Sequence, residues 1–273
     1  MTLDPCRMNE SSRRIEVTSP DGVRIVGSAT GEGPGIALVY GAMMTQPAWA
    51  RLIAQLPGRT VYTYDRRGRG ESTSRSGYDV QWEVEDLVAF ASALTQPLDV
   101  FAHSSGALLA LHALAAGLQV RRLVLYEPPL ASVREPQLTA DLPGRIFDLV
   151  ARGERDEALS MFMQRGMWVP EEDIARLRQG PRWQEQMAYA ETGGYDITIT
   201  RTYPFDPAVL AKLTMPALLL YGDQSPDWMQ RGVRIFADAL PSCRLEVLEG
   251  QGHNAQFTDP ALLGARVTAF LDE

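Results

Sequence analysis

Cysteine and histidine are scarce in this chain of 273 residues. Cys6 and Cys243 are the two cysteines, and they are too few and too far apart to form a disulfide framework or a zinc site. We therefore expect reduced thiols and a cytoplasmic protein. The chain has three histidines, His103, His112 and His253. If a histidine acts as a general base, it must be one of these three.

Excess positive charge and long apolar runs are also lacking. The 26 Lys and Arg residues face 34 Asp and Glu residues, and no basic cluster indicates a surface for nucleic acid or membrane. No run approaches the ~18 apolar residues that a membrane span needs. Residues 1–12 carry no signal-peptide core, and we interpret them as a flexible tail. The 45% hydrophobic content instead suits a globular protein with a large core.

Short apolar segments of buried-strand type alternate with helical patterns along most of the chain. A hairpin around Asp21-Gly22 opens the series, and the last predicted helix has Asp259 as N-cap and Pro260 at its first position. Such alternation predicts a mostly parallel sheet with helices on both faces and ligands at the carboxyl ends of its strands. The eight predicted strands are 14–18, 23–29, 36–40, 60–64, 98–102, 123–126, 217–221 and 244–248.

Residues 131–207 break this alternation, because they hold helical patterns and no convincing strand. We interpret them as a helical cap inserted after the sixth strand, between the two parts of an α/β core domain at 13–130 and 208–273. Methionine and tryptophan are dense in the cap and form adaptable apolar walls. A hydrophobic pocket is therefore expected between cap and sheet, lined by Met163, Met167, Trp168 and Trp183.

The sequence HSSG joins a predicted strand directly to a predicted helix, which is the context of a nucleophile elbow. Such a sharp turn needs small residues two positions before and after the nucleophile. Ala102 and Gly106 flank Ser104 in this way, whereas Ser105 would have His103 at one of these positions. Ser104 is therefore the candidate nucleophile, and the Ser105 backbone N–H, at a helix N-terminus, can donate to an oxyanion.

His253 lies in a glycine-flanked loop just after the last predicted strand, where a general base would face the elbow across the sheet edge. A serine-rich turn and a lone loop histidine can each occur without chemistry, but together they indicate a catalytic pair. We interpret His103 as a packing or hydrogen-bonding residue of the elbow and His112 as structural.

These features resemble the α/β-hydrolase superfamily over nearly the whole chain. The segment YDRRGRGES, which begins at Tyr64, is similar to the D-x-R-G-x-G-x-S turn of that family, and LVYGA stands where the family has H-G-x, with Tyr40 replacing the usual histidine. The resemblance implies a second oxyanion donor at the Ala42 backbone N–H, with Met43 and Met44 lining the pocket beside it. It implies no metal and no cofactor.

The acid of the expected catalytic triad is the point where the sequence departs most from the family. The usual position of this acid, after the seventh strand, holds Ser225, which cannot stabilise an imidazolium as a carboxylate does. Asp223 and Asp227 flank that position. Some relatives carry the acid one strand earlier, where this chain has Glu127. We predict Glu127 as the acid; Asp223, Asp227 and the absence of any acid are the alternatives.

Two functions from different classes follow. The first is a serine hydrolase that cleaves an ester, lactone or thioester of an apolar small molecule through an acyl-enzyme, with Ser104 as nucleophile, His253 as base and Glu127 orienting the base. The second is a non-hydrolytic protein that binds, cyclises or isomerises an apolar small molecule, which the replacements at Tyr40 and Ser225 motivate. A regulatory module has weaker support, and the oligomeric state stays unknown.

Overall fold

Eight strands form one sheet in the computed structural model, which describes residues 12–135 and 137–273. Their spatial order is β1-β2-β4-β3-β5-β6-β7-β8; β1 and β2 run antiparallel to their neighbours and all other pairs are parallel. The predicted fold class is confirmed. The strands are β1 (Arg13–Thr18), β2 (Arg24–Thr30), β3 (Gly35–Val39), β4 (Thr60–Tyr64), β5 (Leu98–His103), β6 (Leu123–Tyr126), β7 (Ala217–Gly222) and β8 (Cys243–Leu248).

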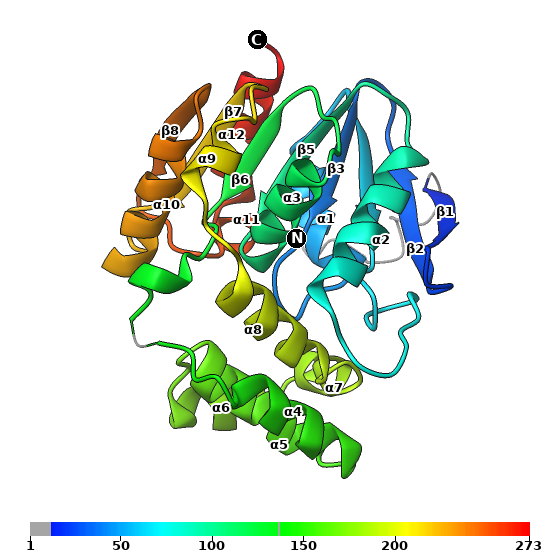
Figure 1. The fold of residues 1–273 in the computed structure, drawn as a ribbon, viewed down its shortest axis with the longest axis vertical. Coiled ribbons are helices and arrows are strands. Elements are labelled where there is room, and N and C mark those ends of the chain that lie inside the picture. The colour runs from blue at the N-terminus through cyan, green and yellow to red at the C-terminus, as the bar shows by residue number, and fades with distance from the viewer. Residues whose placement is uncertain (1–11, 136) are drawn as a thin grey trace.

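Both faces of the central strands are buried, as a parallel sheet requires. Alternate residues of β3 enter different cores: Ala37 and Val39 pack on one face, and Ile36 and Leu38 on the other. Helices α2 (Val80–Ser92), α3 (Ser105–Ala115) and α10 (Asp227–Ala239) cover the first face, and α1 (Ala50–Ile53) and α12 (Pro260–Leu271) cover the second (Figure 1).

The helix ends follow local sequence signals. Asp259 caps α12 by accepting the Leu262 N–H at 3.0 Å, as predicted. Trp49, Leu52, Ile53 and Leu56 have the spacing of one helix face, but the helix formed there is short. Pro47 opens a 3₁₀ turn, η2 (Gln46–Trp49), which leads into the single turn of α1, and Pro57 lies just beyond it. A last short helix before α12 is α11 (Ala255–Thr258).

Between β6 and α9 (Pro207–Leu210), the described residues form helices and no strand. This helical insertion comprises η3 (Ala131–Val133), α4 (Leu142–Ala151), α5 (Arg155–Met161), the π-helical turn η4 (Phe162–Gly166), α6 (Glu171–Leu177), α7 (Pro181–Met187) and α8 (Thr192–Thr202). Figure 1 shows α4, α5, α6 and α7 grouped at one end of the molecule, with α8 between them and the sheet. The insertion has its own apolar core, which includes Ala158, Leu159 and Phe162.

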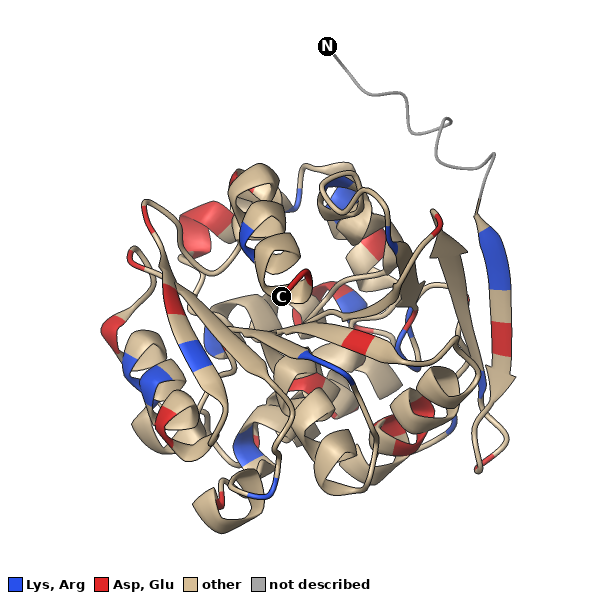
Figure 2. Ribbon diagram, turned by 90° about the horizontal axis from the view of Figure 1, so that it is seen from above, with Lys and Arg blue, Asp and Glu red and all other residues tan. Residues whose placement is uncertain are grey.

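Acidic and basic residues are interspersed on the same elements, as Figure 2 shows for β1 and α10. Within the described ranges, no helix combines the length and the apolar character that crossing a membrane would require. Of the predicted tail over residues 1–12, residues 1–11, Cys6 among them, lie outside the described residues.

Candidate active site

The carboxyl end of β5 turns sharply into α3 at Ser104, which adopts φ 56° and ψ −129°. Such a conformation is unfavourable for a residue with a side chain and persists because the surroundings impose it. A Cβ on Gly106 would lie 2.3 Å from the Tyr40 carbonyl oxygen, and a Cβ on Gly41 would lie 2.7 Å from the Ser104 Cβ. The elbow therefore requires glycine at both positions, since the backbone leaves no room for a side chain.

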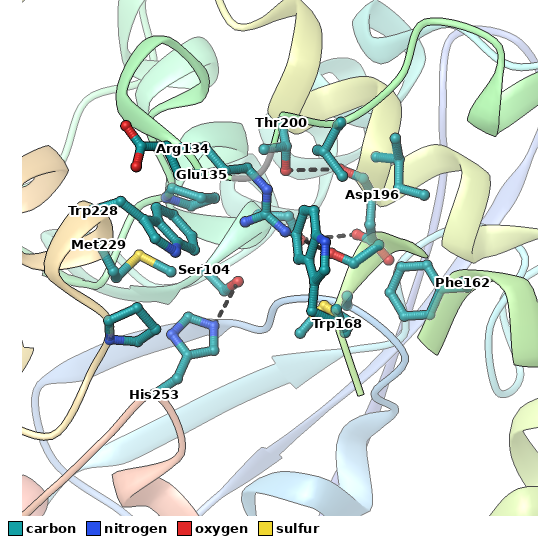
Figure 3. A pocket seen from close by; sticks show the side chains of 18 residues that line it. Ser104, Arg134, Glu135, Phe162, Trp168, Asp196, Thr200, Trp228, Met229 and His253 are labelled. Atoms are coloured by element: carbon teal, nitrogen blue, oxygen red, sulfur yellow. Dashed lines mark hydrogen bonds between the residues drawn. The ribbon is translucent and has the colours of Figure 1, made fainter. Parts of the chain in front are cut away.

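Ser104, His253 and Glu127 form a continuous hydrogen-bonded chain, although they come from three loops far apart in the sequence. The His253 Nε2 lies 3.0 Å from the Ser104 Oγ, and the His253 Nδ1 lies 2.5 Å from the Glu127 Oε2. Figure 3 shows the His253 ring facing the Ser104 hydroxyl at the edge of a pocket. The geometry of this chain is that of an alcohol, an imidazole and a carboxylate aligned for proton transfer.

The Glu127 carboxylate is fully buried directly after β6 and is held by more than the histidine. Its second oxygen, Oε1, accepts the Ser225 hydroxyl at 2.6 Å and the Gly222 N–H at 2.8 Å. The backbone of Glu127 has φ 49°. Ser225, which stands where the family has its acid, thus binds the carboxylate that arrives from the neighbouring strand.

The alternative acids lie outside this chain of hydrogen bonds. Asp223 is exposed and accepts the Gly250 N–H at 2.8 Å, so it closes a turn of the histidine loop. Asp227 is exposed at the first position of α10. In the described part of the chain, neither carboxylate is hydrogen-bonded to His253.

Two aromatic side chains fix the loop that carries His253. The His103 Nε2 donates to the His253 carbonyl at 2.8 Å, and burial lowers the pKa of His103 well below its ordinary value, so the ring is neutral. The Tyr126 hydroxyl donates to the Gly252 carbonyl and accepts the Ala255 N–H at 3.2 Å. The ends of β5 and β6 therefore position the histidine loop as well as Ser104 and Glu127.

A buried ionic network, which the sequence did not indicate, lies beneath the elbow. Arg66 pairs with Glu83 on α2 at 2.7 Å and with Asp196 on α8 at 2.9 Å. Arg69 also pairs with Asp196, at 2.7 Å, and the Ser105 hydroxyl donates to it at 2.8 Å. The YDRRGRGES turn therefore joins the helical insertion to the elbow.

Asp196 is almost fully buried, yet its pKa is below the ordinary value. Burial alone would raise this pKa, but the charges of Arg69 and Arg66 and the Ser105 hydrogen bond outweigh it. The carboxylate is therefore ionised at neutral pH.

A cavity of about 430 Å³, the size of a small-molecule site, opens beside Ser104 between the core and the helical insertion. Ala42, Ser105 and His253 also line it, as do the predicted pocket residues Met167 and Trp168. The Ser105 N–H belongs to the first turn of α3, where helix geometry provides no intrahelical acceptor.

Four residues predicted to line the pocket are absent from its lining. Met44 belongs to the apolar core on the second face of the sheet, which also contains Trp49. Met43, Met163 and Trp183 belong to the insertion's own core, and the Trp183 Nε1 donates to Asp156. Counting apolar residues cannot separate the inner from the outer faces of short helices, and the structure places these four side chains in apolar cores rather than in the cavity wall. Other side chains line the cavity instead, and among them Arg134 and Trp228 were not predicted from the sequence.

The mostly parallel sheet, with Ser104, Glu127 and His253 at the carboxyl ends of its strands, defines an α/β fold of the kind that binds ligands at this edge. The model of the Alpha/beta hydrolase family matches residues 36–266, and the chain belongs to this family. A solved α/β hydrolase from Sphaerobacter thermophilus DSM 20745 is 36% identical, with a TM-score of 0.85 over 94% of this chain and 100% of that one.

Two further relatives carry names of different activities. An esterase structure from Exiguobacterium antarcticum is 18% identical, with a TM-score of 0.74 over 94% of this chain and 99% of its own, and shares the fold. A Bacillus subtilis (strain 168) protein, named as a candidate 2-succinyl-6-hydroxy-2,4-cyclohexadiene-1-carboxylate synthase, is 23% identical over 94% of this chain and 98% of its own.

Gly106→Ala is expected to lower the free energy of unfolding by about 1–3 kcal/mol, because the new methyl group would meet the backbone at Tyr40. The matched control is Gly144→Ala in α4, where a Cβ would meet nothing within 4 Å and alanine favours the helix. Urea denaturation checks both variants. Equal stability of the two would show that the elbow tolerates a side chain.

Asp196→Asn is expected to lower the free energy of unfolding by about 3 kcal/mol at pH 7, because it leaves two buried arginines short of a partner. The folded pKa of Asp196 is lowered, so its stabilising contribution is present above about pH 4 and is lost as the pH falls through the folded pKa. The difference from wild type should therefore narrow in acid.

Urea denaturation between pH 3 and pH 8 measures this difference. Asp173→Asn, which breaks an exposed ion pair with Arg176 within α6, is the matched control and should cost less than about 1 kcal/mol. A pH-independent gap for Asp196→Asn would contradict the assigned pKa direction.

Proposed function

We propose that the protein is a serine hydrolase that cleaves a carboxylic ester, lactone or thioester of a small molecule through an acyl-enzyme. The hydrogen-bonded chain from Ser104 through His253 to Glu127 carries this proposal. Membership of the α/β hydrolase family supports it.

In the proposed reaction, the Ser104 Oγ attacks the acyl carbon while the His253 Nε2 takes its proton. The imidazolium that forms is stabilised by the buried Glu127 carboxylate, which lies 2.5 Å from the Nδ1. The same proton then goes to the leaving alcohol or thiol. Water, activated by His253, next attacks the acyl-enzyme, which releases the acid and restores Ser104.

The backbone N–H groups of Ala42 and Ser105 are the proposed oxyanion donors. Both residues line the cavity beside Ser104, and Ser105 begins a helix whose N-terminus favours negative charge. We further propose that residues 131–207 act as a cap, since Phe162, Met167 and Trp168 supply one wall of the cavity. Such a wall excludes water and contacts the apolar part of the substrate.

The observations that motivated a non-hydrolytic function have structural explanations. Ser225 supports the Glu127 carboxylate, and the Tyr40 hydroxyl accepts the Arg66 N–H at 2.6 Å. Neither replacement removes a group from the hydrogen-bonded chain, so hydrolysis is the favoured function. The Bacillus subtilis relative carries the name of a synthase, so a non-hydrolytic reaction is the alternative against which the tests are designed.

A fluorophosphonate probe should label the wild-type protein covalently, and Ser104→Ala should abolish the labelling, because the probe reacts with an activated serine. Ser105→Ala is the matched control: it removes the adjacent hydroxyl but keeps the backbone donor, and it should still be labelled. Intact-mass spectrometry measures the adduct. A folded wild-type protein that stays unlabelled would contradict the proposal.

Glu127→Gln should lower kcat by about 10³–10⁴-fold, because the amide cannot stabilise the imidazolium. Asp223→Asn and Asp227→Asn, at the exposed alternative positions, should lower it by less than about 5-fold. Turnover of a short-chain ester is measured beside thermal denaturation, so that lost activity is separated from lost structure. Equal losses of kcat in the three variants would show that Glu127 is not the acid of the triad.

A further inference from the structure

Arg134 is a buried cation in the wall of the same cavity as Ser104. It is 7% exposed, and its guanidinium lies between two indole rings, with its Cζ 4.1 Å from the Trp168 ring centroid and 4.6 Å from that of Trp228. Figure 3 shows its side chain reaching between these tryptophans on the side of the pocket where Ser104 and His253 lie.

The other charged residues around the cavity have partners. Asp196 pairs with Arg66 and Arg69, and Glu127 is bound by His253. The Glu135 side chain is 78% exposed and reaches Arg231 at 3.8 Å. Over residues 12–135 and 137–273, no carboxylate oxygen lies within 4.0 Å of the Arg134 guanidinium.

The hydrogen-bonding capacity of Arg134 is also largely unused. A guanidinium has five N–H donors, and here the Nη2 donates to the Gly166 carbonyl at 2.6 Å. The Nε is buried with no acceptor among the described residues. Burial lowers the pKa of Arg134 to about 10, so the group still carries its charge at neutral pH. A buried charge without a counter-ion is costly.

The two indoles compensate for only part of this cost. Both rings stabilise the guanidinium by cation–π contact, but an indole ring offers no hydrogen-bond acceptor to its N–H groups. A carboxylate would supply the missing acceptor, because the N–H donors of a guanidinium project from its edge in a fork that matches the two carboxylate oxygens.

We propose that Arg134 binds a carboxylate of the substrate, so that the site hydrolyses small esters bearing a free carboxylate, such as half-esters of dicarboxylic acids. The proposal rests on the proposed function, because Ser104 must attack the ester end of the same molecule. The expectation of an apolar small-molecule substrate is thereby modified: the apolar walls contact the part of the substrate between its carboxylate and its ester. A single cavity of about 430 Å³ holds both groups, which limits the substrate to a small molecule.

A kinetic comparison tests the specificity. Monoethyl esters of C4 to C8 dicarboxylic acids are compared with ethyl esters of straight-chain monocarboxylic acids of matched length, by pH-stat. Wild type should prefer the half-ester at one or more lengths. In Arg134→Met, the ratio of kcat/KM for half-ester over neutral ester should fall about 10–100-fold, because a charge-assisted hydrogen bond is lost.

Two variants define the cause of that change. Arg134→Lys keeps the charge but loses the fork, and it should restore part of the ratio. Arg176→Met removes an exposed arginine of α6 that does not line the cavity, and its ratio should equal that of wild type. An unchanged ratio in Arg134→Met, with both esters slowed equally, would overturn the proposal and indicate a purely structural arginine.

A binding measurement separates this proposal from the proposed hydrolysis. Ser104→Ala lacks the hydroxyl that would be acylated, so it can bind the half-esters without cleaving them. This variant and Ser104→Ala/Arg134→Met are titrated with the same half-esters by calorimetry. Weaker binding by the double variant, about 10-fold or more, supports the carboxylate site even if wild type hydrolyses none of the esters. Equal affinities, or no binding of any half-ester, would overturn it.

Discussion

The burial of the Glu127 carboxylate is the constraint on which the arrangement of this site depends. An ionised group out of contact with water must be surrounded by donors. Glu127 obtains them from Gly222 and Ser225, near the end of β7, and from His253, which follows β8. The loops after β6, β7 and β8 are thereby fixed relative to one another at one sheet edge. The elbow at Ser104, on the neighbouring strand, then lies within hydrogen-bonding distance of the imidazole.

Much of the fold could be predicted from the sequence because its signals are local. All eight strands were anticipated from apolar runs, and the start of α12 from Asp259-Pro260. The elbow was visible because a sharp turn demands small residues at fixed spacing around Ser104. The pocket walls were not predictable in this way. The helices of the insertion are short, and which face of each looks inward is decided by packing with distant segments, so Trp183 became core and Trp168 became pocket lining.

The ionic network shows a second limit of sequence patterns. Arg66 and Arg69 belong to a turn motif, but their partner Asp196 lies far along the chain on α8, in a segment with no motif of its own. Long-range pairing of this kind leaves no periodic signal. Its effect is nevertheless direct, since the Ser105 hydroxyl at the start of α3 is held by an insertion carboxylate. Helix α8 and the turn at Ser104 therefore share one set of buried charges.

The carboxylate that binds His253 stands at the end of β6 rather than in the loop after β7, and this placement affects what the loop after β7 contributes. In this chain the loop after β7 contributes a hydroxyl, from Ser225, and a backbone N–H, from Gly222. The residues that follow lie outside the hydrogen-bonded chain. Three of them, Pro226, Trp228 and Met229, line the cavity instead. Under the proposed function, substitutions at these positions would alter ligand preference without touching a group of the Ser104–His253–Glu127 chain.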